Sequence, residues 1–180
     1  MHITGGYLKS RKIISPKSEN VRPTLSQIRE SIFSTLFSLI DFENKTFLDA
    51  FAGSGIMGFE AISRGFKSVT FIEKDKKTLN IIKENSSKLN ISADFYVGDS
   101  IKILPKLQKQ FDVIYIDPPY QSGLYASLIN IIIKSQVLLP NGILILEHPK
   151  NLTIDLSNIN VIKQKNYSDK TITYAHINFE

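Results

Sequence analysis

The sequence predicts a doubly wound α/β fold, and three features of the chain predict it. From residue 46 onward, short strand-like segments alternate with segments of helical periodicity. The run from Phe111 to Ile116 is almost wholly apolar, as in a parallel strand covered on both faces. A glycine-rich turn joins the first strand-like segment to a helix. The 180 residues, 42% of them hydrophobic, are enough for one domain with a two-sided core.

The first 23 residues differ from the rest because they are rich in Gly, Ser, Pro and basic residues. Their apolar pieces are short, so residues 1–23 are expected to form a basic arm or small hairpin without a core of its own. Thr24 and Gln27 have the spacing of a capping box, which marks the start of a helix over residues 25–40. Residues 24–180 are then the main domain.

The α/β elements follow in regular order along the main domain. Strands are expected at 46–49, 68–73, 95–97, 111–116 and 142–147. Helices are expected up to about residue 64, from Asp75 to about Leu89, briefly after Asp99, and from 124 to about 136. The C-terminal segment, around Val161 and over 172–179, alternates like an antiparallel pair. Strand–helix alternation of this kind predicts a doubly wound α/β sheet that ends in an antiparallel pair.

Positive charge is concentrated near the N-terminus. Residues 1–30 hold six basic and two acidic residues, a net charge of +4, whereas the remaining 150 residues have a net charge of only +1. A basic arm suits a polyphosphate partner such as nucleic acid, although a solvated tail without a ligand has the same composition.

Several classes of protein are disfavoured by composition. The chain has no cysteine, which excludes disulfides and thiolate metal sites. His2, His148 and His176 lack metal-ligand spacing, so no metal is expected. No run approaches the roughly 20 apolar residues of a membrane helix, and Met1 to Gly6 do not resemble a signal peptide. We expect a cytoplasmic monomer that does not contact a membrane.

Three successive strand ends carry groups that suit an adenosine ligand. Ligands of such sheets bind at the carboxyl ends of the strands. Glycines after the first strand let the backbone approach a ligand closely, and the acid that ends the second strand can accept both ribose hydroxyls. The carboxylate after the third strand can accept from an adenine amino group. The expected cofactor residues are Asp49, Phe51, Gly53, Ser54, Gly55, Glu73, Asp99 and Ser100.

The glycine spacing also fits a dinucleotide fingerprint, so an NAD-dependent oxidoreductase is a competing interpretation. Two features disfavour it. The carboxylate of Asp49 lies just before the turn, where it would repel a pyrophosphate but attract a sulfonium ligand with an ammonium group. The tetrapeptide after the fourth strand has no evident role in hydride transfer.

That tetrapeptide, Asp117-Pro118-Pro119-Tyr120, is the most informative motif of the chain. The two prolines fix the backbone and remove two N–H donors, which leaves acceptors at the strand end. An exocyclic base amine is a poor nucleophile, and acceptors that hold its hydrogens aim its lone pair at a methyl group. Tyr120 offers a face for stacking on an unstacked base. We expect these four residues to be catalytic, in preference to an ordinary turn.

With these residues identified, the chain resembles the class I methyltransferases, and more narrowly the bacterial small-subunit ribosomal RNA guanine-N2 methyltransferases of the RsmD type. The resemblance covers nearly the whole chain. The Gly-Gly start and Arg-Pro-Thr are its more specific motifs. It is carried by Ile3-Thr4-Gly5-Gly6, Arg22-Pro23-Thr24, Arg29-Glu30, Asp49-Ala50-Phe51-Ala52-Gly53-Ser54-Gly55, Phe71-Ile72-Glu73 and Asp117-Pro118-Pro119-Tyr120.

The resemblance implies a class I methyltransferase domain over residues 24–180, with a seven-stranded, mostly parallel sheet and an antiparallel C-terminal strand. It also implies S-adenosylmethionine as cofactor and methylation of a guanine N2 amine in 16S ribosomal RNA. Because no second domain is available to recognise a long sequence, we expect the substrate to be an assembled small-subunit particle or intermediate. The expected RNA contacts are Lys9, Arg11, Lys12, Arg22, Thr24 and Arg29.

Other functions remain open at this point. A DNA adenine-N6 methyltransferase would share the Asp-Pro-Pro-Tyr chemistry, but 180 residues leave little room for its recognition insert. A protein-glutamine methyltransferase would be expected to have Asn in place of Asp117. A non-catalytic RNA-binding module would need neither Glu73 nor Asp99, so S-adenosylmethionine affinity separates it from an enzyme.

Overall fold

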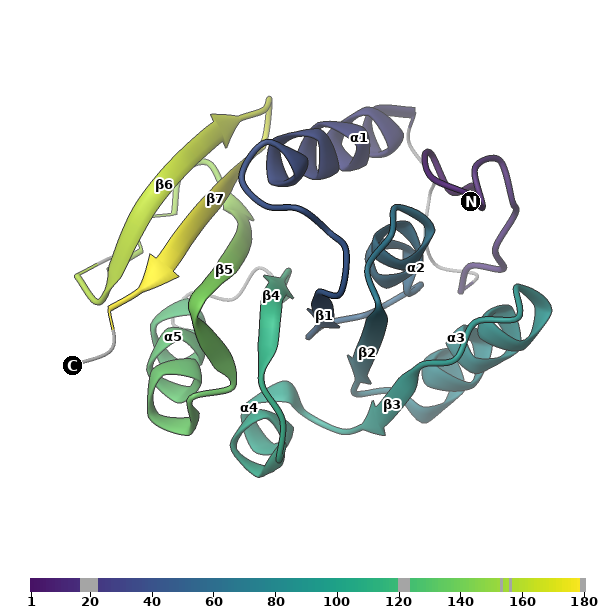
Figure 1. Ribbon diagram of the computed structural model, residues 1–180. Coiled ribbons are helices and arrows are strands. Elements are labelled where there is room, and N and C mark those ends of the chain that lie inside the picture. Colours follow the sequence, from purple (N-terminus) through teal and green to yellow (C-terminus); the bar gives the residue numbers. More distant parts are fainter. Residues whose placement is uncertain (17–22, 120–123, 153, 156, 179–180) are drawn as a thin grey trace.

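The fold is built around one seven-stranded sheet, seen in the computed structural model of Figure 1. The structure describes residues 1–16, 23–119, 124–152, 154–155 and 157–178. The strands are β1 (Thr46–Asp49), β2 (Ser68–Glu73), β3 (Asp94–Val97), β4 (Phe111–Ile116), β5 (Leu138–Pro149), β6 (Ile159–Asn166) and β7 (Lys170–Ile177). Their order across the sheet is β3-β2-β1-β4-β5-β7-β6. The first five strands are parallel, and β7 runs antiparallel to both of its neighbours, as the sequence predicts.

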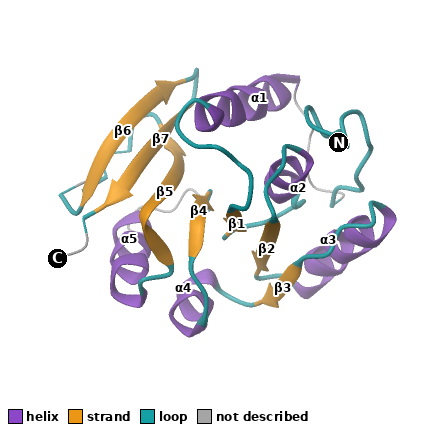
Figure 2. Cartoon of the chain, in the orientation of Figure 1, coloured by secondary structure: helices purple, strands orange, loops and turns teal. Residues whose placement is uncertain are grey.

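Helices cover both faces of the sheet and complete the doubly wound α/β architecture that the sequence predicts (Figure 2). They are α1 (Pro23–Phe37), α2 (Ile56–Ser63), α3 (Lys76–Lys88), α4 (Ser100–Ile103) and α5 (Leu124–Ser135). The apolar side chains of α1, α2 and α3 form one core with their face of the sheet, and α5 packs in a second core on the opposite face.

Two elements, β5 and α1, differ from the sequence prediction by three or more residues at one end. The strand predicted at 142–147 is β5, which extends over 138–149 because Leu138 pairs with Phe111 on β4 and Pro149 pairs with Lys170 on β7. These pairings involve partners distant in the chain, so alternation within the segment did not reveal them. Helix α1 begins at Pro23 and ends at Phe37, three residues before the predicted end.

The N-terminal segment, residues 1–16, packs onto the main domain. Ile3, Leu8 and Ile13 are buried in the same core as α1 and α2, a role that the expectation of a separate arm did not include. Gly6 has a φ of 75°, and a Cβ there would lie 1.6 Å from the carbonyl oxygen of Ser63. The close approach of the segment to the end of α2 therefore requires glycine at position 6.

A buried carboxylate anchors this segment. Glu60, on α2, is fully buried and accepts hydrogen bonds from the backbone N–H and hydroxyl of Thr4, both at 2.7 Å. The guanidinium groups of Arg29 and Arg64 donate to the same carboxylate at 3.3 and 3.2 Å. Glu60 thus joins the N-terminal segment, α1 and α2 through one group. Within the described residues, no helix is long and apolar enough to span a membrane.

Candidate active site

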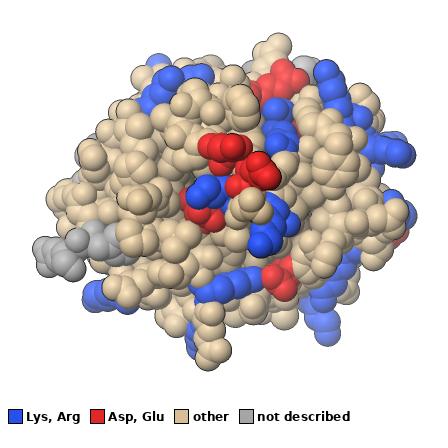
Figure 3. Space-filling model, viewed as in Figure 1, with Lys and Arg blue, Asp and Glu red and all other residues tan. Residues whose placement is uncertain are grey.

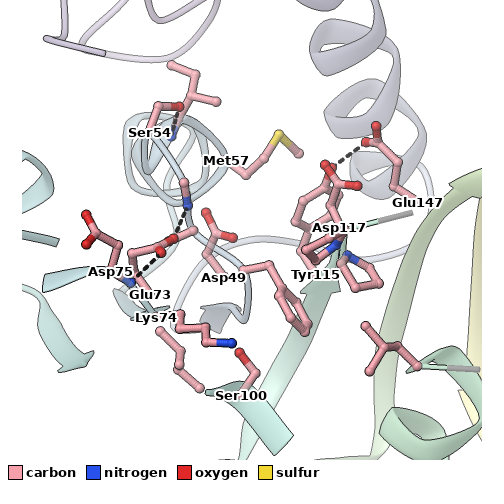
Figure 4. Close-up of a pocket in the computed structure, with 18 of the residues that line it drawn as sticks. Asp49, Ser54, Met57, Glu73, Lys74, Asp75, Ser100, Tyr115, Asp117 and Glu147 are labelled. Atoms are coloured by element: carbon pink, nitrogen blue, oxygen red, sulfur yellow. Dashed lines mark hydrogen bonds between the residues drawn. The ribbon is translucent and has the colours of Figure 1, made fainter. Parts of the chain in front are cut away.

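A pocket of about 1330 Å³ opens at the carboxyl ends of the parallel strands. The lining comes from the ends of β1, β2, β4 and β5, from the start of β7, and from α1 and α2. Figure 4 shows two groups of polar side chains in it, with Asp49 and Glu73 on one side and Asp117, Tyr115 and Glu147 on the other. We call these the cofactor half and the target half.

The turn after β1 is held by the acid that ends β2. The carboxylate of Glu73 accepts hydrogen bonds from the N–H of Gly53 at 2.8 Å and from the N–H of Asp75 at 2.9 Å (Figure 4). Gly55 has a φ of 78° and precedes α2, so the turn adopts the left-handed conformation that glycine favours. Gly53 and Ser54 line the pocket, whereas Gly55 lies outside the lining and packs near Ile82.

Asp49 is the most unusual ionisable group of the pocket. It is 1% exposed, and its Oδ2 accepts from the N–H of Gly58 at 3.2 Å. Its Oδ1 atom is buried without a hydrogen-bond partner. Burial, together with the nearby charge of Glu73, raises the pKa of Asp49 to about 7. A buried acceptor without a partner is costly, so this oxygen suits a ligand that brings a positively charged donor.

The remaining cofactor residues predicted from the sequence also line the pocket. Asp99 begins α4 as its N-cap and accepts from the N–H of Ile101 at 3.1 Å. Ser100 is buried and its hydroxyl donates to the carbonyl of Ala50, which ties α4 to the end of β1. Phe51 contributes an apolar wall. All the predicted cofactor residues except Gly55 therefore meet in one cavity.

The target half begins where β4 ends. Asp117 and Pro118 line the pocket with Pro119, and Pro118 is buried while Pro119 is exposed. Tyr120, the fourth residue of the predicted motif, lies outside the described residues. The structure therefore places three of the four predicted catalytic residues beside the cofactor half.

Sequence reasoning missed three residues of the target half. Tyr115, Glu147 and Lys170 are all buried and line the pocket. The hydroxyl of Tyr115 and the ammonium of Lys170 both donate to the carboxylate of Glu147. Burial and the charges of Glu147, Asp117 and Asp49 raise the pKa of Tyr115 well above its usual value. Glu147 is the last residue of the strand predicted at 142–147, so the strand-end rule would have found it even though β5 continues to Pro149. No local signal marks Lys170.

The predicted RNA contacts are divided between surface and interior. Lys9, Arg11 and Lys12 are exposed on the N-terminal segment, and Figure 3 shows Lys and Arg side chains along that side of the molecule. Arg29 is instead buried at the pocket, where its guanidinium is paired with Glu60 and donates to the carbonyl of His2 at 2.9 Å. It holds the fold together and is not placed as a surface phosphate contact. Arg22 and the side chain of Thr24 lie outside the described residues.

Comparison with known proteins agrees with this geometry. Residues 1–176 match the family described as conserved hypothetical protein 95. The chain is 35% identical to the ribosomal RNA small subunit methyltransferase D of Buchnera aphidicola subsp. Acyrthosiphon pisum, over 98% of this chain and 93% of the relative. It is also 35% identical to the protein of the same name from Haemophilus influenzae, over 92% and 88%. The solved structure of yhhF from Escherichia coli has a TM-score of 0.88 and 25% identity, and the match covers 100% of this chain and 99% of that one.

Proposed function

Since the chain belongs to the RsmD family of methyltransferases, we propose that it methylates the exocyclic N2 amine of a guanine in 16S ribosomal RNA. The rRNA methyltransferase activity named for its relatives supports the substrate class. The observation that supports the proposal most directly is that the cofactor half and the target half line the same pocket. An amine held at Asp117 would therefore lie next to a ligand held at Asp49 and Glu73.

The cofactor is S-adenosylmethionine, which when bound supplies an electrophilic methyl group on a sulfonium. The residues present fit it. The orphaned, buried oxygen of Asp49 suits the ammonium group, and Glu73 suits the ribose hydroxyls. Asp99 suits the adenine amino group. A cation bound at Asp49 would favour the charged form of this carboxylate and so oppose the effect of burial on its pKa.

Asp117 and the Pro118-Pro119 segment would hold the amine. The guanine amine loses nucleophilicity because its lone pair is delocalised into the ring. Acceptors that bind its two hydrogens favour a tetrahedral nitrogen, and the new N–C bond then forms as the C–S bond breaks. The proton lost from the nitrogen goes to Asp117 or to water. In this proposal Tyr120 stacks on the base, which must leave its helix to enter the pocket.

The RNA would be held by charge and shape. Lys9, Arg11 and Lys12 form an exposed basic surface that is fixed to α2 through the buried residues of the N-terminal segment. Contacts of this kind to phosphates supply affinity without sequence information. Selectivity for one guanine would then come from the shape of a folded small-subunit particle.

Two measurements test the proposal. Mass spectrometry of 16S RNA from a strain that lacks the gene should show the loss of one N2-methylguanosine, and the purified protein should restore it in particles from that strain. Methyl transfer to purified particles should exceed transfer to protein-free 16S RNA at one ionic strength. An unchanged modification pattern, or a methyl group found on adenine N6, would refute the guanine assignment.

A further inference from the structure

The target half contains a charged pair that the proposed function does not use. Glu147 and Lys170 are only 5% and 7% exposed, yet both line the pocket. Their side chains bond to each other, and the hydroxyl of Tyr115 donates to the same carboxylate. The backbone carbonyl of Glu147 also accepts from the hydroxyl of Tyr125 at 2.9 Å. The side chain of Glu147 is therefore held by two donors, Tyr115 and Lys170.

The register of the sheet sets the order of these groups. Ile116, the last residue of β4, pairs with Leu146 on β5, so Asp117 directly after β4 and Glu147 on β5 are the next positions along these neighbouring segments. Because β7 runs antiparallel, its first residue, Lys170, pairs with Pro149 at the same edge of the sheet. The edge therefore presents an acceptor at Asp117, an acceptor at Glu147 and a donor at Lys170, in that order.

The stability of the folded protein does not by itself explain why Glu147 and Lys170 are a buried charged pair. Two charges withdrawn from water lose hydration, and apolar residues of similar volume often stabilise a core equally well. Nearby positions in the same strands are apolar, including Leu146 and Ile172. A charged pair retained at the wall of a pocket is more simply explained by a ligand.

We infer that Glu147 and Lys170 recognise the edge of the target base, an inference that rests on the proposed function. Guanine presents three groups along one edge: the N2 amine, the N1–H donor and the O6 acceptor. With the amine at Asp117, the next group requires an acceptor and the third requires a donor. Glu147 and Lys170 supply them in that order. The carboxylate of Glu147 accepts from Tyr115 and from Lys170, one bond at each oxygen. Each carboxylate oxygen has two lone pairs, so Glu147 can accept a further hydrogen bond.

The same order disfavours adenine. Beside its exocyclic amine, adenine has an unprotonated ring nitrogen, which would place a lone pair against the carboxylate of Glu147. The pair would therefore act as a specificity determinant by attracting one purine and repelling the other.

The test uses particles whose 16S RNA carries either guanine or 2-aminopurine at the methylated position, prepared by ligation of a synthetic segment. The analogue keeps the N2 amine but has no N1–H and no O6. Wild-type protein should favour guanine in kcat/KM. Glu147→Gln and Lys170→Met should each reduce that preference by roughly 10- to 100-fold, the range expected for a hydrogen bond to a charged group. The intrinsic reactivities of the two bases cancel when enzyme forms are compared.

Tyr125→Phe is the matched control, because it removes a buried hydroxyl that contacts the backbone of Glu147 and leaves both charges in place. It should keep the wild-type preference. If Lys170→Met fails to fold, the double variant Glu147→Leu and Lys170→Met removes both charges and should lose the preference while still binding S-adenosylmethionine.

An unchanged preference in variants that bind S-adenosylmethionine would overturn the inference and leave the proposed function standing. So would failure of every variant, the double one included, to bind the cofactor, because the pair would then serve the fold. If wild-type protein forms no N2-methylguanine in the guanine particles, the proposed function itself fails.

Discussion

The carboxylate of Glu73 accepts a 2.8 Å hydrogen bond from the N–H of Gly53, so the end of β2 holds the glycine turn that follows β1. A second bond from the N–H of Asp75 fixes the other oxygen. One side chain thus shapes the cofactor half, and in the proposed function it also contacts the ribose.

Glu73→Ala should weaken binding of S-adenosylmethionine by at least about tenfold, because hydrogen bonds to a charged group contribute roughly 1.5–3 kcal/mol each. Glu73→Gln keeps an acceptor oxygen and should lose less of the affinity for S-adenosylmethionine. Isothermal calorimetry on the purified proteins measures both affinities. Equal affinity for wild-type protein and Glu73→Ala would remove Glu73 from the cofactor site.

Asp49 should make cofactor binding depend on pH. Its pKa is raised from the usual 3.8 to about 7, so below pH 7 the ligand must first displace a proton. Affinity should rise about tenfold per pH unit between pH 5 and 7. Asp49→Asn should bind S-adenosylmethionine weakly, and its affinity should not change with pH in this range. If the affinity of the wild-type protein is also independent of pH, Asp49 is already charged in the free protein.

The same pKa predicts a stability effect in the free protein. An acid whose pKa is raised on folding binds its proton more tightly in the folded chain. Its stabilising contribution is complete below pH 3.8 and is lost as the pH rises to about 7. Asp49→Asn should therefore gain in Tm relative to wild type between pH 5 and pH 8, measured without cofactor. A constant difference across that range would contradict the raised pKa.

Asp117→Ala should reduce the single-turnover rate of methyl transfer by about 100-fold or more while cofactor affinity changes little, because in the proposed function the side chain acts on the amine. Asp117→Asn retains an acceptor oxygen and should keep part of the activity. Rapid-quench measurements with saturating particles separate this step from binding. Wild-type rates in Asp117→Ala would exclude the residue from the chemistry.

Neutralising Lys9, Arg11 and Lys12 to Gln should lower methyl transfer and flatten its salt dependence, because fewer counterions are released on binding. Cofactor affinity and Tm should stay unchanged, since all three side chains are exposed. Deleting residues 1–16 should instead destabilise the whole domain, because Ile3, Leu8 and Ile13 leave its core. Full methyl-transfer activity in the neutralised protein would show that the RNA binds elsewhere on the molecule.

Glu60→Ala should destabilise the protein by about 3–5 kcal/mol, because it leaves the buried guanidinium of Arg29 without its carboxylate. Glu84→Ala is the control. It breaks the exposed pair with Lys88, and such pairs contribute little, typically about 0–1 kcal/mol. Urea unfolding measures both. A loss of less than about 1 kcal/mol in Glu60→Ala would show that the carboxylate does not anchor the N-terminal segment.

The sequence by itself determined the fold class and much of the cavity. Strand–helix alternation and the rule that ligands bind at strand ends depend on local patterns, so Asp49, Glu73, Asp99 and Asp117 could be placed in one cavity before their strands were paired. The glycine turn is also local, because it requires particular backbone conformations at Gly53 and Gly55.

Only the tertiary structure decided what those residues face. The bonds of Glu60 to Thr4 and Arg29 join residues 56 and 31 positions apart, and Lys170 reaches Glu147 across 23. Such contacts depend on the order of the strands and on the face of the sheet against which each helix packs. Neither can be read from the composition or the periodicity of the sequence. For this reason Arg29, expected at the RNA surface, lies buried beside the pocket, and the charged pair of the target half became visible only once β7 was placed next to β5.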